Sequence, residues 1–66
     1  MTKEEFNQWM ADMRYSPTDA ARELGLHRNT VMNYARGTQA GSEKPAPIPR
    51  YIELACAQLK ALRAFT

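Results

Sequence analysis

The chain has 66 residues, one cysteine, one histidine and a formal net charge of +2. A chain of about this length buries only about 60% of the surface that it exposes when unfolded, so we expect one domain with a small core. The single cysteine excludes an intrachain disulfide, and the single histidine lies far from it in sequence, which argues against a structural zinc site. We therefore expect no metal and no cofactor, and stability that comes from close helix packing and from association of copies.

The sequence contains no signal for a membrane or for export. No apolar run approaches the roughly 18 residues of a membrane span, and the N-terminal sequence MTKEEFNQW is charged where a signal peptide is apolar. A single cysteine fits a reducing compartment. We expect a cytoplasmic protein without a membrane partner.

Charged side chains are distributed unevenly along the chain. Residues 1–24 carry three basic and five acidic side chains, whereas residues 51–66 carry two basic and one acidic. The segment 25–50 carries Arg28, Arg36, Lys44 and Arg50 against Glu43 alone. This positive middle segment fits a polyanionic partner and fits equally well an ordinary solvated surface, so charge alone does not decide between them.

The first helix is predicted over residues 3–13. Thr2 and Glu5 form a T-x-x-E capping box, which satisfies free backbone N–H groups at a helix start. The large apolar side chains that follow recur at the spacing of one helical face, namely Phe6, Trp9, Met10 and Met13. We interpret this stripe as core. Glu4 and Glu5 then belong to the first helical turn and not to a catalytic pair.

The second helix is predicted to begin after Ser16. Ser16 caps the helix, Pro17 suits the first helical position, and Asp19 lies in the first turn, where a negative charge is favourable. Gly25 ends the helix, because glycine adopts the left-handed conformation at little cost. The residues expected to face inward are Ala20, Ala21 and Leu24, with Leu26 following as an apolar plug.

The third helix is predicted from Arg28 to Arg36, with His27 near its cap and Gly37 at its end. Its inward side chains are Val31 and Tyr34, three residues apart, with Ala35 beside them. Its outward side chains are predicted to be Arg28, Asn29, Met32, Asn33 and Arg36.

A loop over residues 37–49 separates this helix from the last one. The segment GTQAGSEKPAPIP is rich in glycine, alanine and proline, and each proline restrains its own φ and the residue before it. The fourth helix is predicted from Pro49 to about Ala64, followed by Phe65. Its apolar stripe is expected to consist of Ile52, Ala55, Cys56, Leu59 and Leu62, with Cys56 packed in the core.

Residues 17–36, PTDAARELGLHRNTVMNYAR, meet the requirements of two short helices that cross at a tight turn. Ala21 is small where the backbones approach, Gly25 tolerates a positive φ, and apolar side chains from both helices lock the crossing. This segment resembles the helix-turn-helix of the Cro and phage-repressor (XRE-like) family on Ala21, Gly25, Leu26, Val31, Tyr34 and the run RNTVMNYARG.

The resemblance implies an all-α, lambda-repressor-like DNA-binding domain of four or five short helices. Residues 1–66 then form a single domain, with the helix-turn-helix at 17–36 and a dimerisation helix at about 49–65. Two departures stand out. The family often has serine or threonine where His27 lies, and glutamine near Pro17 and Thr18. Its five-helix layout is also shortened here to about four helices.

A second resemblance is narrower. The 66-residue length, the Pro-Ala-Pro segment at residues 45–47 and the apolar last helix are similar to those of small anti-CRISPR-associated regulators. Those proteins repress the operon that encodes them. This resemblance implies an autoregulator carried by a phage or another mobile element.

By position, the helix-turn-helix resemblance assigns roles to individual residues. Arg28, Asn29 and Asn33 are expected to read base edges, since arginine pairs with guanine and asparagine with adenine, and Met32 is expected to contact a thymine methyl. Without the motif, Asn29 and Asn33 are better interpreted as solvated polar side chains on an exposed helix face, and it is the motif that favours base contact. The residues expected to bind phosphates are Ser16, Thr18, His27, Arg36, Lys44 and Arg50. For Tyr51, a phosphate contact and a place over the core remain alternatives.

One short recognition helix contacts only a few base pairs, so we expect a homodimer. Two copies on a two-fold axis match an inverted-repeat operator whose half-sites lie about 34–36 Å apart. The last helix carries more apolar side chains than so small a core needs. We predict that Leu59, Leu62 and Phe65 form the dimer interface.

The predicted function is therefore a sequence-specific repressor of transcription that binds double-stranded DNA and occludes a promoter, its own included. No small-molecule ligand is expected in so short a chain. The alternative is a protein-interaction module, such as an antitoxin that binds a partner through the last helix. RNA binding is less well supported, because the chain has no arginine-rich run. An enzyme is not expected, since there is no second histidine and no glycine-rich phosphate loop.

Overall fold

The computed structural model describes residues 1–39, 41 and 43–65. Within this part of the chain it consists of four helices and one isolated β-bridge, between Thr38 and Pro45, with no strand. The helices are α1 (Lys3–Met13), α2 (Pro17–Leu24), α3 (Arg28–Arg36) and α4 (Arg50–Ala64). The all-α prediction is confirmed, and so are the four predicted helices. Pro49, predicted as the first residue of the last helix, is its N-cap. Ala40 and Ser42 of the predicted loop lie outside the described residues.

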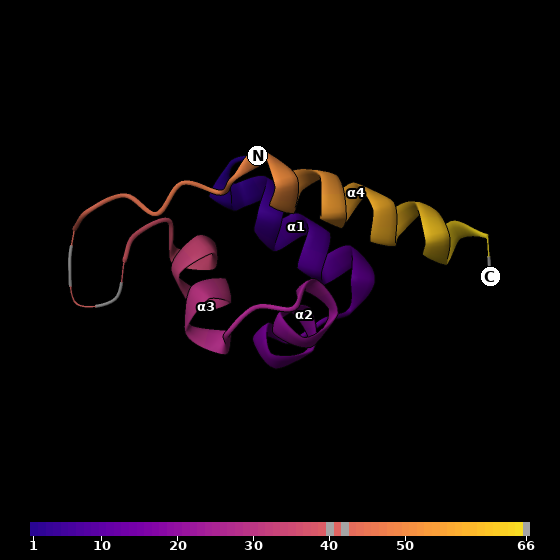
Figure 1. Ribbon diagram of the computed structural model, residues 1–66, viewed down its shortest axis with the longest axis horizontal. Helices are drawn as coiled ribbons and strands as arrows, with labels where there is room; N and C mark the ends of the chain where they lie inside the picture. The colour runs from indigo at the N-terminus through magenta and orange to yellow at the C-terminus, as the bar shows by residue number, and fades with distance from the viewer. Residues whose placement is uncertain (40, 42, 66) are drawn as a thin grey trace.

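The helices are arranged around α1. α3 packs against α2 and α1, and α4 lies along α1 on the other side of the molecule from α3 (Figure 1). The long loop after α3 returns the chain to the start of α4 (Figure 1). This arrangement leaves one side of α3 and one side of α4 uncovered.

The capping box predicted at Thr2 and Glu5 is present, and Ser16 caps α2 as predicted, in a capping box of its own with Asp19. In α1 the Thr2 hydroxyl accepts the Glu5 N–H at 3.1 Å, and the Thr2 N–H donates to the Glu5 carboxylate at 2.8 Å. In α2 the same reciprocal pair joins Ser16 and Asp19, with both bonds at 3.2 Å. Gly25 ends α2 with φ +69°, a conformation in which an L side chain is strained. These local bonds explain why the helix boundaries follow so closely from the sequence.

Two aspartate carboxylates, those of Asp12 and Asp19, should make the stability of the fold depend on pH. Hydrogen bonds from the Ser16 backbone and side chain lower the pKa of Asp19, and hydrogen bonds from Gln8 and then Lys60 lower the pKa of Asp12. A carboxyl whose pKa is lower in the folded state stabilises the fold at pH values above its unfolded pKa. That stabilisation is lost as the pH falls through the folded pKa.

We therefore expect the melting temperature to fall when the pH drops below about 4, the usual aspartate pKa. Thermal unfolding followed by circular dichroism between pH 7 and pH 2 measures this. The double variant Asp12→Asn, Asp19→Asn should melt lower than the wild type at pH 7, and the gap should narrow in acid. A gap of constant size across this range would contradict the assignment.

The core contains apolar side chains from all four helices. The buried residues are Phe6, Trp9, Met10, Met13, Ala20, Ala21, Val31, Tyr34, Ile52 and Cys56. Phe6 is at the centre, with its ring 5.8 Å from that of Tyr34 and 5.7 Å from that of Trp9. The Trp9 indole N–H donates to the Cys56 carbonyl at 3.0 Å, which joins α1 to α4. Burial raises the pKa of the Cys56 thiol to about 11, so Cys56 is an apolar packing residue as predicted.

Leu62, predicted both for the apolar stripe of α4 and for the dimer interface, is not part of the core. Leu62 is 54% exposed, whereas Ile52 and Cys56 are buried and Leu59 is half-buried. The neighbouring Arg63, although exposed, lies on the side of α4 that meets the end of α1. The Arg63 guanidinium donates to the Met13 carbonyl at the end of α1 and lies 5.9 Å from the centre of the Tyr15 ring. The turn of the helix therefore directs Leu62 to solvent.

None of the described helices combines the length and the apolar content that crossing a lipid bilayer requires.

Candidate nucleic-acid interface

The turn between α2 and α3 fixes how the two helices cross. The Leu26 N–H donates to the Ala21 carbonyl at 2.9 Å, and Gly25 provides the left-handed residue between them. Ala20 and Ala21 are buried, and Leu24 and Leu26 are half-buried against the core. Small residues at the crossing thus allow the two backbones to approach, and apolar residues of the turn hold the angle.

A second contact fixes the far end of α3. Asn7 in α1 donates through Nδ2 to the Ala35 carbonyl at 2.9 Å, across 28 residues of sequence. The stem of Lys3 lies against Gly37, where an added Cβ would be 2.8 Å from the Lys3 Cδ. Neither residue was among the predicted site residues. No local signal reveals them, because both contacts depend on how α1 crosses α3.

His27 caps α3 in the position where serine or threonine was expected. Its Nδ1 accepts the Asn29 N–H at 3.1 Å. An imidazole that accepts through Nδ1 carries its hydrogen on Nε2, so the exposed ring presents a donor to the surroundings. The cap therefore explains the departure at this position. The predicted phosphate contact of His27 stays a prediction, with Nε2 as its donor.

The predicted base-reading residues share one side of α3. Arg28 and Asn29 are exposed at its start, and Met32 and Asn33 are half-buried in its second turn. Arg36 is exposed in the last turn and donates through Nη2 to the Asn33 Oδ1 at 2.6 Å. The opposite side of α3 is anchored by Val31, which is fully buried, and by Tyr34. The fold thus presents these five side chains together while it holds the helix from behind.

The charge at the start of α3 differs from that of the other described helices. α1, α2 and α4 each have an acidic residue in the first turn, which suits the positive end of the helix dipole. α3 has none, and its first residue is Arg28. A cation at this end costs about 0.3–1 kcal/mol of stability. Arg28 therefore occupies a position that helix stability alone disfavours.

The predicted phosphate-binding residues lie in different surroundings. At the start of α2 the Asp19 carboxylate accepts from the Ser16 N–H, so an acidic side chain already lies at this helix end. Thr18 is exposed beside it. Lys44 is exposed in the loop, and Arg50 is exposed at the start of α4, where it lies 3.9 Å from Glu53. The phosphate contacts of these residues stay predictions.

The large apolar side chains that are exposed in the described part of the chain belong to α4 and its C-cap. The exposed large apolar residues are Tyr51 at 65%, Leu54 at 56%, Leu62 at 54% and Phe65 at 88%. Tyr51 therefore does not serve mainly as a cover for the core. Of the three predicted dimer residues, Leu62 and Phe65 are exposed, whereas Leu59 packs partly against its own core. Tyr51 and Leu54 were not among the residues predicted for the dimer.

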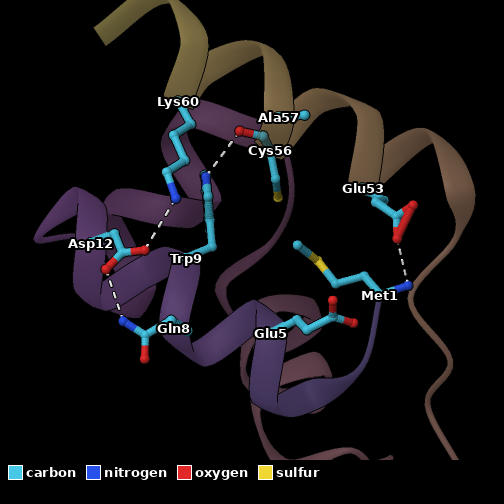
Figure 2. A pocket seen from close by; sticks show the side chains of 9 residues that line it. All are labelled: Met1, Glu5, Gln8, Trp9, Asp12, Glu53, Cys56, Ala57 and Lys60. Carbon is cyan, nitrogen blue, oxygen red and sulfur yellow. Dashed lines mark hydrogen bonds and ion pairs between the residues drawn. The ribbon is translucent and has the colours of Figure 1, made fainter. Parts of the chain in front are cut away.

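A pocket of about 340 Å³ lies between α1 and α4 and includes no residue of α2 or α3 (Figure 2). Its floor includes Trp9 and Cys56. Four of its charged groups form two pairs: Lys60 lies 3.3 Å from Asp12, and the amino group of Met1 lies 2.6 Å from Glu53 (Figure 2). These pairs join the two helices, so we interpret the pocket as part of the seam between α1 and α4.

Comparison of the chain with protein-family models, with curated proteins and with solved structures finds no match in any of the three. The candidate site is therefore identified from its geometry and not from known relatives. Its central feature is a short helix with donor-rich side chains, held rigidly from behind by α1 and α2.

Proposed function

We propose that this protein binds double-stranded DNA in a sequence-specific way and represses transcription. In this proposal α3 enters the major groove. The observation that carries the proposal is the start of α3, where Arg28 stands at a helix end that has no acidic side chain. A polyanion placed at this end would compensate the unfavourable charge, because phosphates favour both a helix N-terminus and an arginine.

The side chains on this face fit the chemistry of base edges. Arg28 offers the two parallel donors that guanine O6 and N7 accept, and Asn29 can pair with adenine N6 and N7. Met32, one helical turn further along the same face, is half-buried and suits contact with a thymine methyl. His27, whose Nδ1 is engaged by the Asn29 N–H, keeps Nε2 as a donor for a DNA phosphate. Contacts to DNA phosphates position the protein, and contacts to base edges give sequence specificity.

The apolar side of α4 supports a dimeric form of this repressor. Positions 51, 54, 55, 58, 61, 62 and 65 fall on one side of a helix with 3.6 residues per turn, and none of them is charged. The charged residues of α4 are Arg50, Glu53, Lys60 and Arg63, all outside this stripe. In the proposal this stripe packs against its copy, which places two α3 helices on one inverted repeat. Binding at the promoter of its own operon then blocks transcription by occlusion.

Selection from a random double-stranded DNA library at moderate salt tests the proposal. We expect enrichment of an inverted repeat whose half-sites are centred about 34–36 Å apart, roughly one helical turn. A gel shift on DNA from upstream of its own gene should then give a specific complex. No enriched sequence, or equal affinity for single-stranded RNA of random sequence, would contradict the proposal. Co-purification of a neighbouring gene product in the absence of DNA binding would favour the antitoxin alternative.

A further inference from the structure

Asn33 and Arg36 form a pair on the exposed side of α3. The Arg36 guanidinium donates through Nη2 to the Asn33 Oδ1 at 2.6 Å, slightly shorter than the roughly 2.7–2.9 Å usual for a charged N–H donor. Asn33 is half-buried and Arg36 is exposed. The two lie three residues apart, so they are neighbours on the same helix surface. The amide of Asn33 is thus held in one orientation by a cation.

This orientation changes what Asn33 can recognise. An asparagine amide has one acceptor, Oδ1, and one donor group, Nδ2, and bidentate reading of adenine uses both. In this structure Oδ1 is engaged by a positively charged group. The amino group at adenine N6 would meet that same cation. Guanine instead presents two acceptors, O6 and N7, which suit the Nδ2 donors and the remaining N–H groups of the guanidinium.

We propose that Arg36 is a specificity-determining residue that sets Asn33 to read guanine in place of the adenine that a free asparagine reads. The inference rests on the proposed binding of DNA by α3. It replaces two separately predicted roles, base reading by Asn33 and phosphate binding by Arg36, with one joint role. The base readout at this position then belongs to the pair.

The test is library selection with the wild type and with Arg36→Met. Methionine keeps an unbranched stem and removes the guanidinium, and the exposed position should tolerate it. The wild type should enrich guanine at one position of each half-site. Arg36→Met should raise the ratio of adenine to guanine at this position by about 5- to 150-fold, which is the discrimination of one bidentate pair. The base preferences at the other positions should stay unchanged. Asn33→Ala should weaken the guanine preference there, and the double variant with Arg36→Met should change the preference by less than the sum of the two single effects, because the readout belongs to the pair.

Arg50→Met is the matched control, because it also removes one exposed arginine. It should weaken binding to all sequences alike and keep the wild-type base preferences. Adenine at this position in the wild-type selection, or an Arg36→Met profile weakened evenly at all positions, would overturn the inference and leave DNA binding standing. If the wild type enriches no sequence, the proposed function fails and this inference fails with it. Circular dichroism of each variant verifies that it is folded.

Discussion

Replacing Arg28 by glutamate is expected to make the protein more stable and to abolish specific DNA binding. Arg28 is exposed at the first position of α3, a helix with no acidic residue in its first turn. Removal of the positive charge and addition of a negative one should raise the free energy of unfolding by about 0.3–1 kcal/mol, the size of a charge–dipole interaction. If Arg28 reads a base as proposed, the same change removes a contact worth about 1–3 kcal/mol and places a carboxylate against DNA.

Opposite changes in stability and binding are informative, because a merely damaged fold would lower both. Thermal unfolding at pH 7 measures the change in stability, and titration of labelled operator DNA measures the change in affinity. Arg50→Glu is the matched control, since Arg50 is also exposed at the first position of a helix. It should weaken binding to specific and random DNA alike. Specific binding by Arg28→Glu at wild-type affinity would remove Arg28 from the interface and with it the main support for the proposed function.

The helix boundaries could be predicted because each is fixed by side chains close in sequence. The pairs Thr2–Glu5 and Ser16–Asp19 form their hydrogen bonds within one turn, and Gly25 and Gly37 end their helices through their own backbone conformation. The core could be predicted for the same reason, since the spacing of apolar residues within one helix determines which side it buries.

Contacts between helices could not be predicted in this way. Asn7 reaches Ala35 across 28 residues, and Arg63 reaches Met13 across 50. Each of them depends on the crossing angle of two helices, which the spacing within one helix does not determine. The different burial of Leu62 and Cys56 within one predicted stripe has the same origin, because periodicity alone did not reveal that Arg63 would contact the end of α1. The Asn33–Arg36 pair is local and lies at a spacing that favours contact, but the direction of its hydrogen bond required the structure.

The double variant Leu54→Glu, Leu62→Glu is expected to be a folded monomer that no longer binds an inverted repeat tightly. Both leucines are more than half exposed, at 56% and 54%, so their replacement should leave the core intact. In the proposed dimer they face a second copy, and two carboxylates on each helix would bring like charges together at the interface. Sedimentation at micromolar concentration should show a dimer for the wild type and a monomer for this variant.

Loss of the dimer should weaken binding to the full operator far more than binding to a half-site. Linking two binding sites raises affinity by about 100- to 10,000-fold over a single site, because the second contact becomes intramolecular. The control is Ala57→Glu, Ala64→Glu, which adds the same charges at exposed positions of α4 outside the apolar stripe. It should remain dimeric and bind the operator. A wild-type monomer with and without DNA, or equal losses on half-site and full operator in the leucine variant, would mean that α4 does not join two copies and that its apolar side has another occupant.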